Sequence, residues 1–235
     1  MTLFNATDYA RLHTLVFAPN YPGYRPDVIE APAGDAARQD TGQRYAHVAA
    51  KYLRQYDGHP SDHSMLHWYL TRAHGHAVQV ALRLGVPEAF LPSYEHGALR
   101  VLEYPPGTGS HRHTDVGLLT TLCYRNVPGL VRSMSLDALN ALDAIEPGLH
   151  LGRIAREIGL TNMATPHYVA PVAEVQHSIV YFAVPNHEAI LPSGERLGTW
   201  LDAQMAKMRY DRPDNSTVKQ IETGLDSTPG KGGPG

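Results

Sequence analysis

The stretch His111–Tyr124 constrains this chain more than any other part of it. It contains His113-Thr114-Asp115, and in an extended strand residues i and i+2 point to the same face. The imidazole and the carboxylate can therefore meet one cation, while Thr114 faces away. The following residues, Val116 to Leu122, are apolar and β-branched enough to form a buried strand. The stretch thus predicts a metal site at the mouth of a rigid β scaffold.

Two protein ligands hold a divalent ion weakly, so a third ligand from a neighbouring strand is expected. His167, in the short run Ala164–Val169, is the best candidate. It would complete the arrangement of two histidines and one carboxylate that leaves positions open on iron. A His-x-Asp triplet alone is a weak pattern in a chain with 14 histidines, where a strand with a polar face would give the same letters.

The order of the surrounding motifs makes the pattern specific. Leu102-Glu-Tyr-Pro-Pro106 precedes the triplet, Gly-Leu-Leu-Thr follows it, and Gly129–Arg132 and Thr165–Val169 come later. In order and spacing these motifs resemble the iron(II)- and 2-oxoglutarate-dependent oxygenases of the isopenicillin N synthase-like group, over about residues 97–210. The interval of 54 positions from His113 to His167 is the usual one in that family.

The resemblance implies a mainly β fold with flanking helices, built on a double-stranded β-helix (jelly roll) core. It implies an oxidoreductase that uses Fe(II), O2 and 2-oxoglutarate to hydroxylate, desaturate or cyclise a small molecule at a C–H bond. His113, Asp115 and His167 would be the metal ligands. The intact Asp115 argues against halogenation, since halogenases of the family have a small residue there.

The resemblance also implies which residues hold the far carboxylate of 2-oxoglutarate. The family uses a tyrosine before His-x-Asp and an Arg-x-Ser pair after the distal histidine. Tyr104 and Ser178 match, but Gln176 stands in the place of the arginine. A neutral amide cannot reproduce the bidentate, charge-assisted bond that an arginine makes with a carboxylate.

Three explanations of this departure stay open. Another cation can reach the cosubstrate from a different strand; the candidates are Arg100, Arg112, Arg125 and Arg132. The chain can be an iron oxidase that works without 2-oxoglutarate, or a non-catalytic β-barrel that binds a metal or a small molecule. His111 shares a face with His113 and, with Arg112, is a possible outer partner of the ligands or the substrate.

Composition excludes several other classes of protein. A chain of 235 residues with 43% hydrophobic content can build one sizeable core. The net charge of −3 argues against nucleic acid as a partner. No run approaches the ~20 apolar residues of a membrane span, and no signal peptide is evident. The single cysteine, Cys123, rules out an intramolecular disulfide framework and is expected to be buried. Without a disulfide framework or an evident signal peptide, a cytoplasmic protein is expected, with a small-molecule substrate and no membrane partner.

Periodicity and turn residues divide the chain into three parts. Residues 1–96 are expected to form an N-terminal loop and helical support region, 97–210 the oxygenase core with a C-terminal helix, and 211–235 a disordered tail. The proline-containing segment Phe17 to Asp40 is expected to be a surface loop that acts as a lid. Helices are predicted over 41–56, 62–84, 154–158 and 197–210, and strands over 97–104, 116–124, 129–133, 149–153, 167–171 and 176–184.

Overall fold

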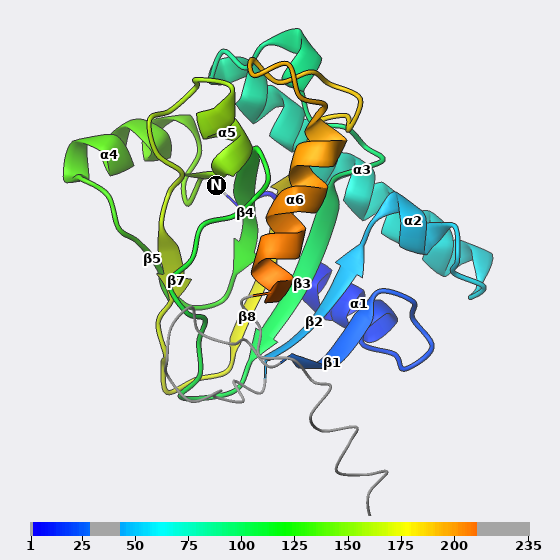
Figure 1. The fold of residues 1–235 in the computed structure, drawn as a ribbon. Helices are drawn as coiled ribbons and strands as arrows, with labels where there is room; N and C mark the ends of the chain where they lie inside the picture. Colours follow the sequence, from blue (N-terminus) through cyan, green and yellow to red (C-terminus); the bar gives the residue numbers. More distant parts are fainter. Residues whose placement is uncertain (1, 29–42, 211–235) are drawn as a thin grey trace, which may run out of the picture.

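The computed structural model describes residues 2–28 and 43–210 (Figure 1). The disordered tail predicted for 211–235, and residues 29–40 of the predicted lid, lie outside this range. The elements in chain order are α1 (Ala6–Val16), β1 (Tyr24–Val28), β2 (Gln43–Val48), α2 (Ala50–Leu53), α3 (Pro60–Arg83), a 3-10 turn (Glu88–Phe90), β3 (Ala98–Tyr104), β4 (Leu119–Arg125), β5 (Leu130–Arg132), α4 (Leu136–Ile145), β6 (His150–Leu151), α5 (Arg153–Glu157), β7 (His167–Val169), β8 (Gln176–Ala183) and α6 (Leu197–Tyr210).

Two antiparallel sheets form the centre of the molecule. The larger sheet has the order β1-β2-β3-β8-β4-β6, and the smaller one pairs β5 with β7. The fold is therefore mainly antiparallel sheet with flanking helices. In the part of the chain that the structure describes, no helix has the length and apolarity needed to cross a membrane.

The large sheet has one apolar face and one face with polar groups. Register places Leu99 opposite Tyr181 and Val101 opposite Ile179, and directly paired residues share a face. These four side chains are completely buried. The alternate residues, among them Arg100 and Tyr104, point to the other face, which is the one that carries the candidate site.

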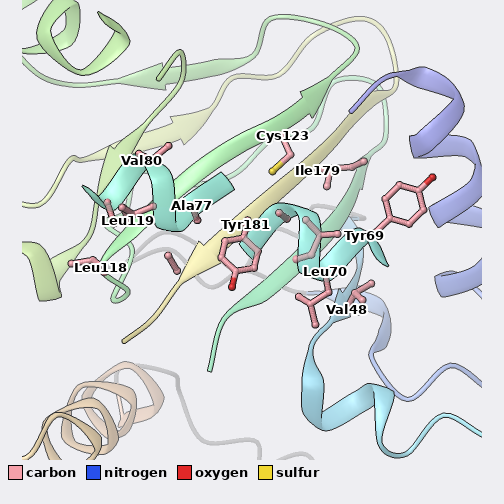
Figure 2. Close-up of a cluster of buried hydrophobic side chains, with 14 of the residues drawn as sticks. Val48, Tyr69, Leu70, Ala77, Val80, Leu118, Leu119, Cys123, Ile179 and Tyr181 are labelled. Atoms are coloured by element: carbon pink, nitrogen blue, oxygen red, sulfur yellow. The ribbon is translucent and has the colours of Figure 1, made fainter. Parts of the chain in front are cut away.

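Helices α1 and α3 cover the apolar face. In Figure 1 both lie behind the sheet, whereas α6 passes in front of it. Figure 2 shows Tyr69, Leu70, Ala77 and Val80 of α3 gathered against strand residues such as Ile179. One side of α3 is buried along its length, because its buried residues recur at the three- and four-residue spacing of an amphipathic helix: Leu66, Tyr69, Leu70, Ala73, Ala77, Val80 and Ala81. Apolar surface buried in this layer stabilises the fold by about 25 cal/mol per Å².

The helix predicted over 41–56 is wrong in its first half. Residues Gln43–Val48 form β2, which pairs with β3 from Arg44↔Glu103 to Val48↔Leu99, and only Ala50–Leu53 is helical. Gln43, Arg44 and Ala46 suit a helix by intrinsic propensity, but pairing with a long neighbouring strand overrides a propensity of a few tenths of a kcal/mol per residue.

The loop predicted over Phe17 to Asp40 is also wrong in part, because Tyr24–Val28 forms strand β1 on the edge of the sheet. Pro26 lies inside it, and an edge strand tolerates proline because one side of the strand needs no N–H donor. Helix α4 was not predicted. The predicted strands of residues 97–184 are confirmed with shifted or shortened bounds, as are the helices over 62–84, 154–158 and 197–210.

The lowered pKa of His47 in β2 indicates how the free energy of unfolding changes in acid. Its Nε2 accepts a hydrogen bond from Arg100 Nε at 2.7 Å, and burial, with Arg100, Lys51 and Arg25 nearby, lowers the pKa of His47 from 6.5 to about 2. The unfolded chain therefore binds a proton below pH 6.5 that the folded chain does not, so stability falls as pH decreases through this window.

We expect the free energy of unfolding to fall by about 2 kcal/mol more between pH 7 and pH 5 in the native chain than in His47→Gln, which keeps an acceptor but does not titrate. Urea unfolding at both pH values measures this difference. Equal pH dependence in the two proteins would contradict the assignment.

Candidate metal centre

Three side chains predicted as ligands meet at one point. Nε2 of His113 lies 3.7 Å from Asp115 Oδ1, and Nε2 of His167 lies 3.8 Å from the same oxygen. One ligand atom from each residue falls within 4.8 Å of the other two, which is a spacing that could hold a metal ion. Among the described residues this is the one group of three or more such side chains that meets this spacing.

Backbone pairing brings the two histidines together. His113 N donates to His167 O, and His167 N donates to His113 O, both at 2.9 Å. The pair is an isolated antiparallel bridge rather than part of a long strand, and Asp115 lies just beyond it. The prediction that His113 and Asp115 meet is confirmed, although the extended strand predicted from 116 begins only at Leu119.

Both imidazoles are held in one orientation. His113 Nδ1 donates to the carbonyl of His111 at 2.7 Å, and His167 Nδ1 donates to the carbonyl of Thr165 at 3.1 Å. A carbonyl only accepts, so Nδ1 carries the proton and Nε2 keeps its lone pair for a metal. His111, predicted as an outer partner, thus acts through its backbone, and Arg112 is exposed to solvent.

The carboxylate is oriented in the same way. Thr120 of β4 donates its hydroxyl to Asp115 Oδ2 at 2.5 Å, which leaves Oδ1 to face the histidines. Burial on its own raises the pKa of Asp115, but the imidazoles of His167 and His150 and the Thr120 hydroxyl outweigh it, so the pKa lies below its usual value. Asp115 is therefore ionised at neutral pH and suits a divalent cation.

The distal histidine stays neutral, as a metal ligand must. Burial lowers the pKa of His167, and the opposing effect of Asp115 does not restore it. His150 of β6 lies beside it, with ring centroids 4.1 Å apart, and burial followed by the nearby His167 lowers the pKa of His150 to about 3. Two imidazoles and one carboxylate with free lone pairs fit an iron(II) ion.

A glycine lets the supporting backbone approach closely. A Cβ at Gly152 would lie 2.0 Å from Gly117 O and 3.1 Å from Asp115 O. Because Gly152 has no side chain, Arg153 N can donate to Asp115 O at 2.9 Å and Gly152 N to Leu118 O at 2.8 Å. The turn between β6 and α5 thus fixes the backbone that carries Asp115.

Tyr104, Gln176 and Ser178, three of the residues predicted for the cosubstrate, line a small cavity. Register places Tyr104 opposite Gln176 and Arg125 opposite Ser178, so these four side chains share the polar face of the large sheet. They line a cavity of about 50 Å³, which β5 and β7 close with Leu130 and Val169 among others. Tyr104 also receives a hydrogen bond from Gln43 Nε2 at 3.1 Å.

Only one of the four candidate arginines lines this cavity. Arg125 does so. Arg100 bonds to His47 and lies over the rings of Tyr45 and Phe182. Arg132 bonds to Asp143 at 2.6 Å and to the carbonyl of Leu149 at 3.0 Å.

Gln176 has a structural role that an arginine could not share without rearrangement. Its Nε2 donates to the carbonyls of Thr108 and Ala170, at 3.1 and 2.9 Å. Its Oε1 occupies the space where a Cβ at Gly129 would lie, at 2.0 Å. The amide thus links β8 by hydrogen bonds to the segments that contain Thr108 and Ala170, at one end of the cavity.

Three polar residues of this region were not predicted from the sequence, namely Gln43, Thr120 and His150. Each acquires its place through strand pairing: β2 with β3, and β4 with β6. No spacing in the sequence signals such pairing. Thr120 offered a weak signal, since it follows Asp115 by five residues in a strand that was predicted.

Comparisons with known proteins bear on the fold. No protein-family model matches the chain, and no curated protein matches it significantly. Solved structures do. A protein of Shewanella oneidensis described provisionally as an oxygenase aligns with a TM-score of 0.56 and 17% identity, covering 88% of this chain and 78% of that one.

Full-length T7H of Neurospora crassa, in complex with alpha-KG, aligns with a TM-score of 0.56 and 18% identity over 85% of this chain and 81% of its own. The dioxygenase for auxin oxidation of rice aligns with a TM-score of 0.50 and 19% identity over 87% and 83%. The resemblance found in the sequence is thus confirmed at the level of fold: this chain has the fold of these oxygenases.

The hydrogen bond from Thr120 to Asp115 can be tested in the metal-free protein. Thr120→Val leaves a buried carboxylate oxygen without its donor and should lower the free energy of unfolding by about 1.5–3 kcal/mol at pH 7. Thr121→Val is the matched control, because Thr121 is equally buried but its hydroxyl contacts only Cys123 Sγ, at 3.8 Å. Urea unfolding that shows the same loss in both variants would contradict the role of Thr120.

Proposed function

We propose that this protein is a non-haem iron(II) oxygenase that uses 2-oxoglutarate and O2 to oxidise a C–H bond of a small molecule. One observation carries the proposal: Nε2 of His113, Nε2 of His167 and Oδ1 of Asp115 converge, while the second heteroatom of each side chain is already bonded to the protein. Such ligands are preorganised for one metal and occupy one side of it.

The sheet arrangement supports a jelly-roll core. The large sheet supplies β3, β8, β4 and β6, the small sheet supplies β5 and β7, and the His113↔His167 bridge adds the His-x-Asp segment beside β7. We assign residues 97–210 to this double-stranded β-helix and C-terminal helix, and residues before 97 to a support region. That region also contributes β1 and β2 to the large sheet.

The cavity beside the centre suits the far end of 2-oxoglutarate. Val169, which lines it, follows His167 by two strand positions, a rise of about 7 Å. A five-carbon ketoacid that chelates the metal through its 1-carboxylate and 2-keto oxygens can extend its 5-carboxylate into this space. There Arg125 supplies the cation that Gln176 does not, and Tyr104 and Ser178 supply hydroxyl groups.

Bound iron supplies the oxidative chemistry in such a site. The balanced outcome for hydroxylation is that 2-oxoglutarate, O2 and the substrate C–H give succinate, CO2 and the alcohol, with one oxygen atom in succinate and one in the product. The protein's own residues orient the ligands and bind the ketoacid. T7H structures that hold alpha-KG and thymine support a small-molecule substrate for this fold, without identifying the one used here.

Metal binding is the first test. His167→Ala removes one of three ligands and should abolish stoichiometric Fe(II) binding while the fold is retained. His96→Ala is the matched control, because His96 stacks on His187 at 3.7 Å and is not part of the three-residue group. Anaerobic titration with Fe(II) checks the result. Tight binding retained by His167→Ala would contradict the ligand assignment.

Turnover is the second test. Anaerobically purified protein given Fe(II), O2 and 2-oxoglutarate should form succinate, because oxidative decarboxylation of the ketoacid yields it. Product formation that needs O2 but no ketoacid would instead place the chain with oxidases that take electrons from the substrate or an added reductant.

Arg125 provides the third test. Arg125→Gln should weaken 2-oxoglutarate binding by roughly 10- to 150-fold, because a hydrogen bond to a charged group contributes about 1.5–3 kcal/mol. Arg112→Gln is the control, because Arg112 is exposed and does not line the cavity. Equilibrium binding to the metal-loaded protein checks both. Equal affinities in the two variants would exclude Arg125.

A further inference from the structure

Strand β4 contains one residue more than its pairing with β8 needs. Leu122 pairs with Val180, and Tyr124, two residues later, pairs with Ile179, which is directly adjacent to Val180. Cys123 is therefore left over between two consecutive pairs, which is the geometry of a β-bulge. Beyond Cys123 the pairing of β4 is shifted by one position.

The bulge also shows in the directions of the side chains. Side chains of a regular strand alternate between the two faces of a sheet. Cys123 lies in the apolar cluster under the helices (Figure 2), and the ring of the next residue, Tyr124, is 5.7 Å from the ring of Tyr9 in α1. These two neighbours in the chain thus share the face that the helices cover. Leu122 and Arg125, three residues apart, both line the cavity on the other face.

Hydrogen bonds on both sides of the bulge hold the shifted pairing. The carbonyl of Cys123 accepts a bond from the backbone N–H of Phe4, in the segment before α1, at 3.0 Å. Asn126 then fixes the end of β4 to β8. Its Nδ2 donates to Val175 O at 2.8 Å, and its Oδ1 accepts from His177 N at 2.7 Å. The shifted register is therefore fixed from both ends.

A regular β4 would give the cavity a different wall. With Leu122 opposite Val180 and no extra residue, Tyr124 would pair with Ser178 and put its phenol on the cavity face. Arg125 would turn toward the layer of α1 and α3, where an unpaired guanidinium is costly to bury. The bulge reverses both placements, because Arg125 pairs with Ser178 instead.

We propose that the extra residue of β4 determines what the cavity binds. By placing the guanidinium of Arg125, and not the phenol of Tyr124, on the cavity face with Ser178, the bulge gives the cavity its affinity for a carboxylate. Cys123 acts through its backbone and is a positioning residue. That the carboxylate is the far end of a ketoacid rests on the proposed function, whereas the placement of the two side chains does not.

The test uses the full-length, metal-loaded protein without oxygen and two ketoacids. 2-Oxoglutarate carries a far carboxylate, whereas 2-oxobutyrate has the same chelating end without it. Cys123 is the single cysteine of the chain, so Cys123→Ala gives a background free of thiols. In that background Arg125→Cys and Tyr124→Cys each introduce one thiol. Treatment with 2-aminoethyl methanethiosulfonate then attaches an ammonium group to the thiol through a disulfide.

Arg125→Cys should weaken 2-oxoglutarate by roughly 10- to 150-fold and leave 2-oxobutyrate unchanged, because a hydrogen bond to a charged group is lost. The attached ammonium should restore part of that affinity. Tyr124→Cys is the matched control and should change the affinity for neither ketoacid, with or without the ammonium. Mass spectrometry should also show that the thiol at position 124 reacts more slowly than the one at 125, because that side chain packs toward Tyr9.

Deletion of Cys123 provides a second test. It removes the surplus residue and leaves a regular strand in which Arg125 still pairs with Ser178, so the preference for 2-oxoglutarate over 2-oxobutyrate should be retained. In a strand without a bulge the same deletion would turn Arg125 to the other face. Loss of the preference in a folded deletion variant would therefore overturn the inference. If the shortened chain does not fold, the two cysteine variants decide.

The outcomes separate this inference from the proposed function. If the native protein prefers 2-oxoglutarate, but Arg125→Cys keeps that preference or Tyr124→Cys loses it, the inference alone is wrong. If the native protein binds neither ketoacid, or both equally, the proposed cosubstrate is wrong, and the labelling rates decide the placement of the side chains. Equal labelling at the two positions, or faster labelling at 124, overturns the placement whatever the cosubstrate is.

Discussion

The candidate site depends on one reciprocal pair of backbone hydrogen bonds, between His113 and His167. These residues are far apart in the chain, and the two bonds set their side chains next to each other before any metal is present. Because the ring nitrogens then bond to carbonyls two residues earlier in each segment, the same short stretch of backbone also decides which nitrogen faces the centre. A ligand set fixed in this way loses little conformational entropy when an ion binds.

The large sheet connects this pair to the rest of the site. Its apolar face packs on α1 and α3, which holds the strands in register. Its other face carries Thr120 toward Asp115 and Arg125 toward the cavity. Gln176 stands where the resembled family has an arginine, and its amide nitrogen has a structural role instead. It donates hydrogen bonds to the carbonyls of Thr108 and Ala170 in two loops. Arg125, on the paired strand β4, supplies a cation from a neighbouring position, as the proposed binding of a carboxylate in this cavity requires.

Local spacing made part of this structure predictable. His113 and Asp115 are two residues apart, and Tyr104, Gln176 and Ser178 fall at motif positions, so their shared location could be predicted. Strand β2 could not, because Gln43, Arg44 and Ala46 favour a helix by intrinsic propensity and the segment becomes a strand through its pairing with β3. His150 could not either, since it depends on a strand of only two residues. Helix α4 was missed although it carries a readable signal: Ser135 caps it, and Leu136, Leu139, Leu142 and Ile145 recur every third residue.

The most direct measurement is anomalous diffraction from crystals of the Fe(II) protein grown without oxygen in the presence of 2-oxoglutarate. The account predicts one iron peak, about 2.0–2.2 Å from Nε2 of His113, Nε2 of His167 and Oδ1 of Asp115, as nitrogen and oxygen ligands bind divalent metals. It predicts the 5-carboxylate of the ketoacid at the guanidinium of Arg125. An iron peak at other side chains, or a ketoacid bound away from the three ligands, would contradict it.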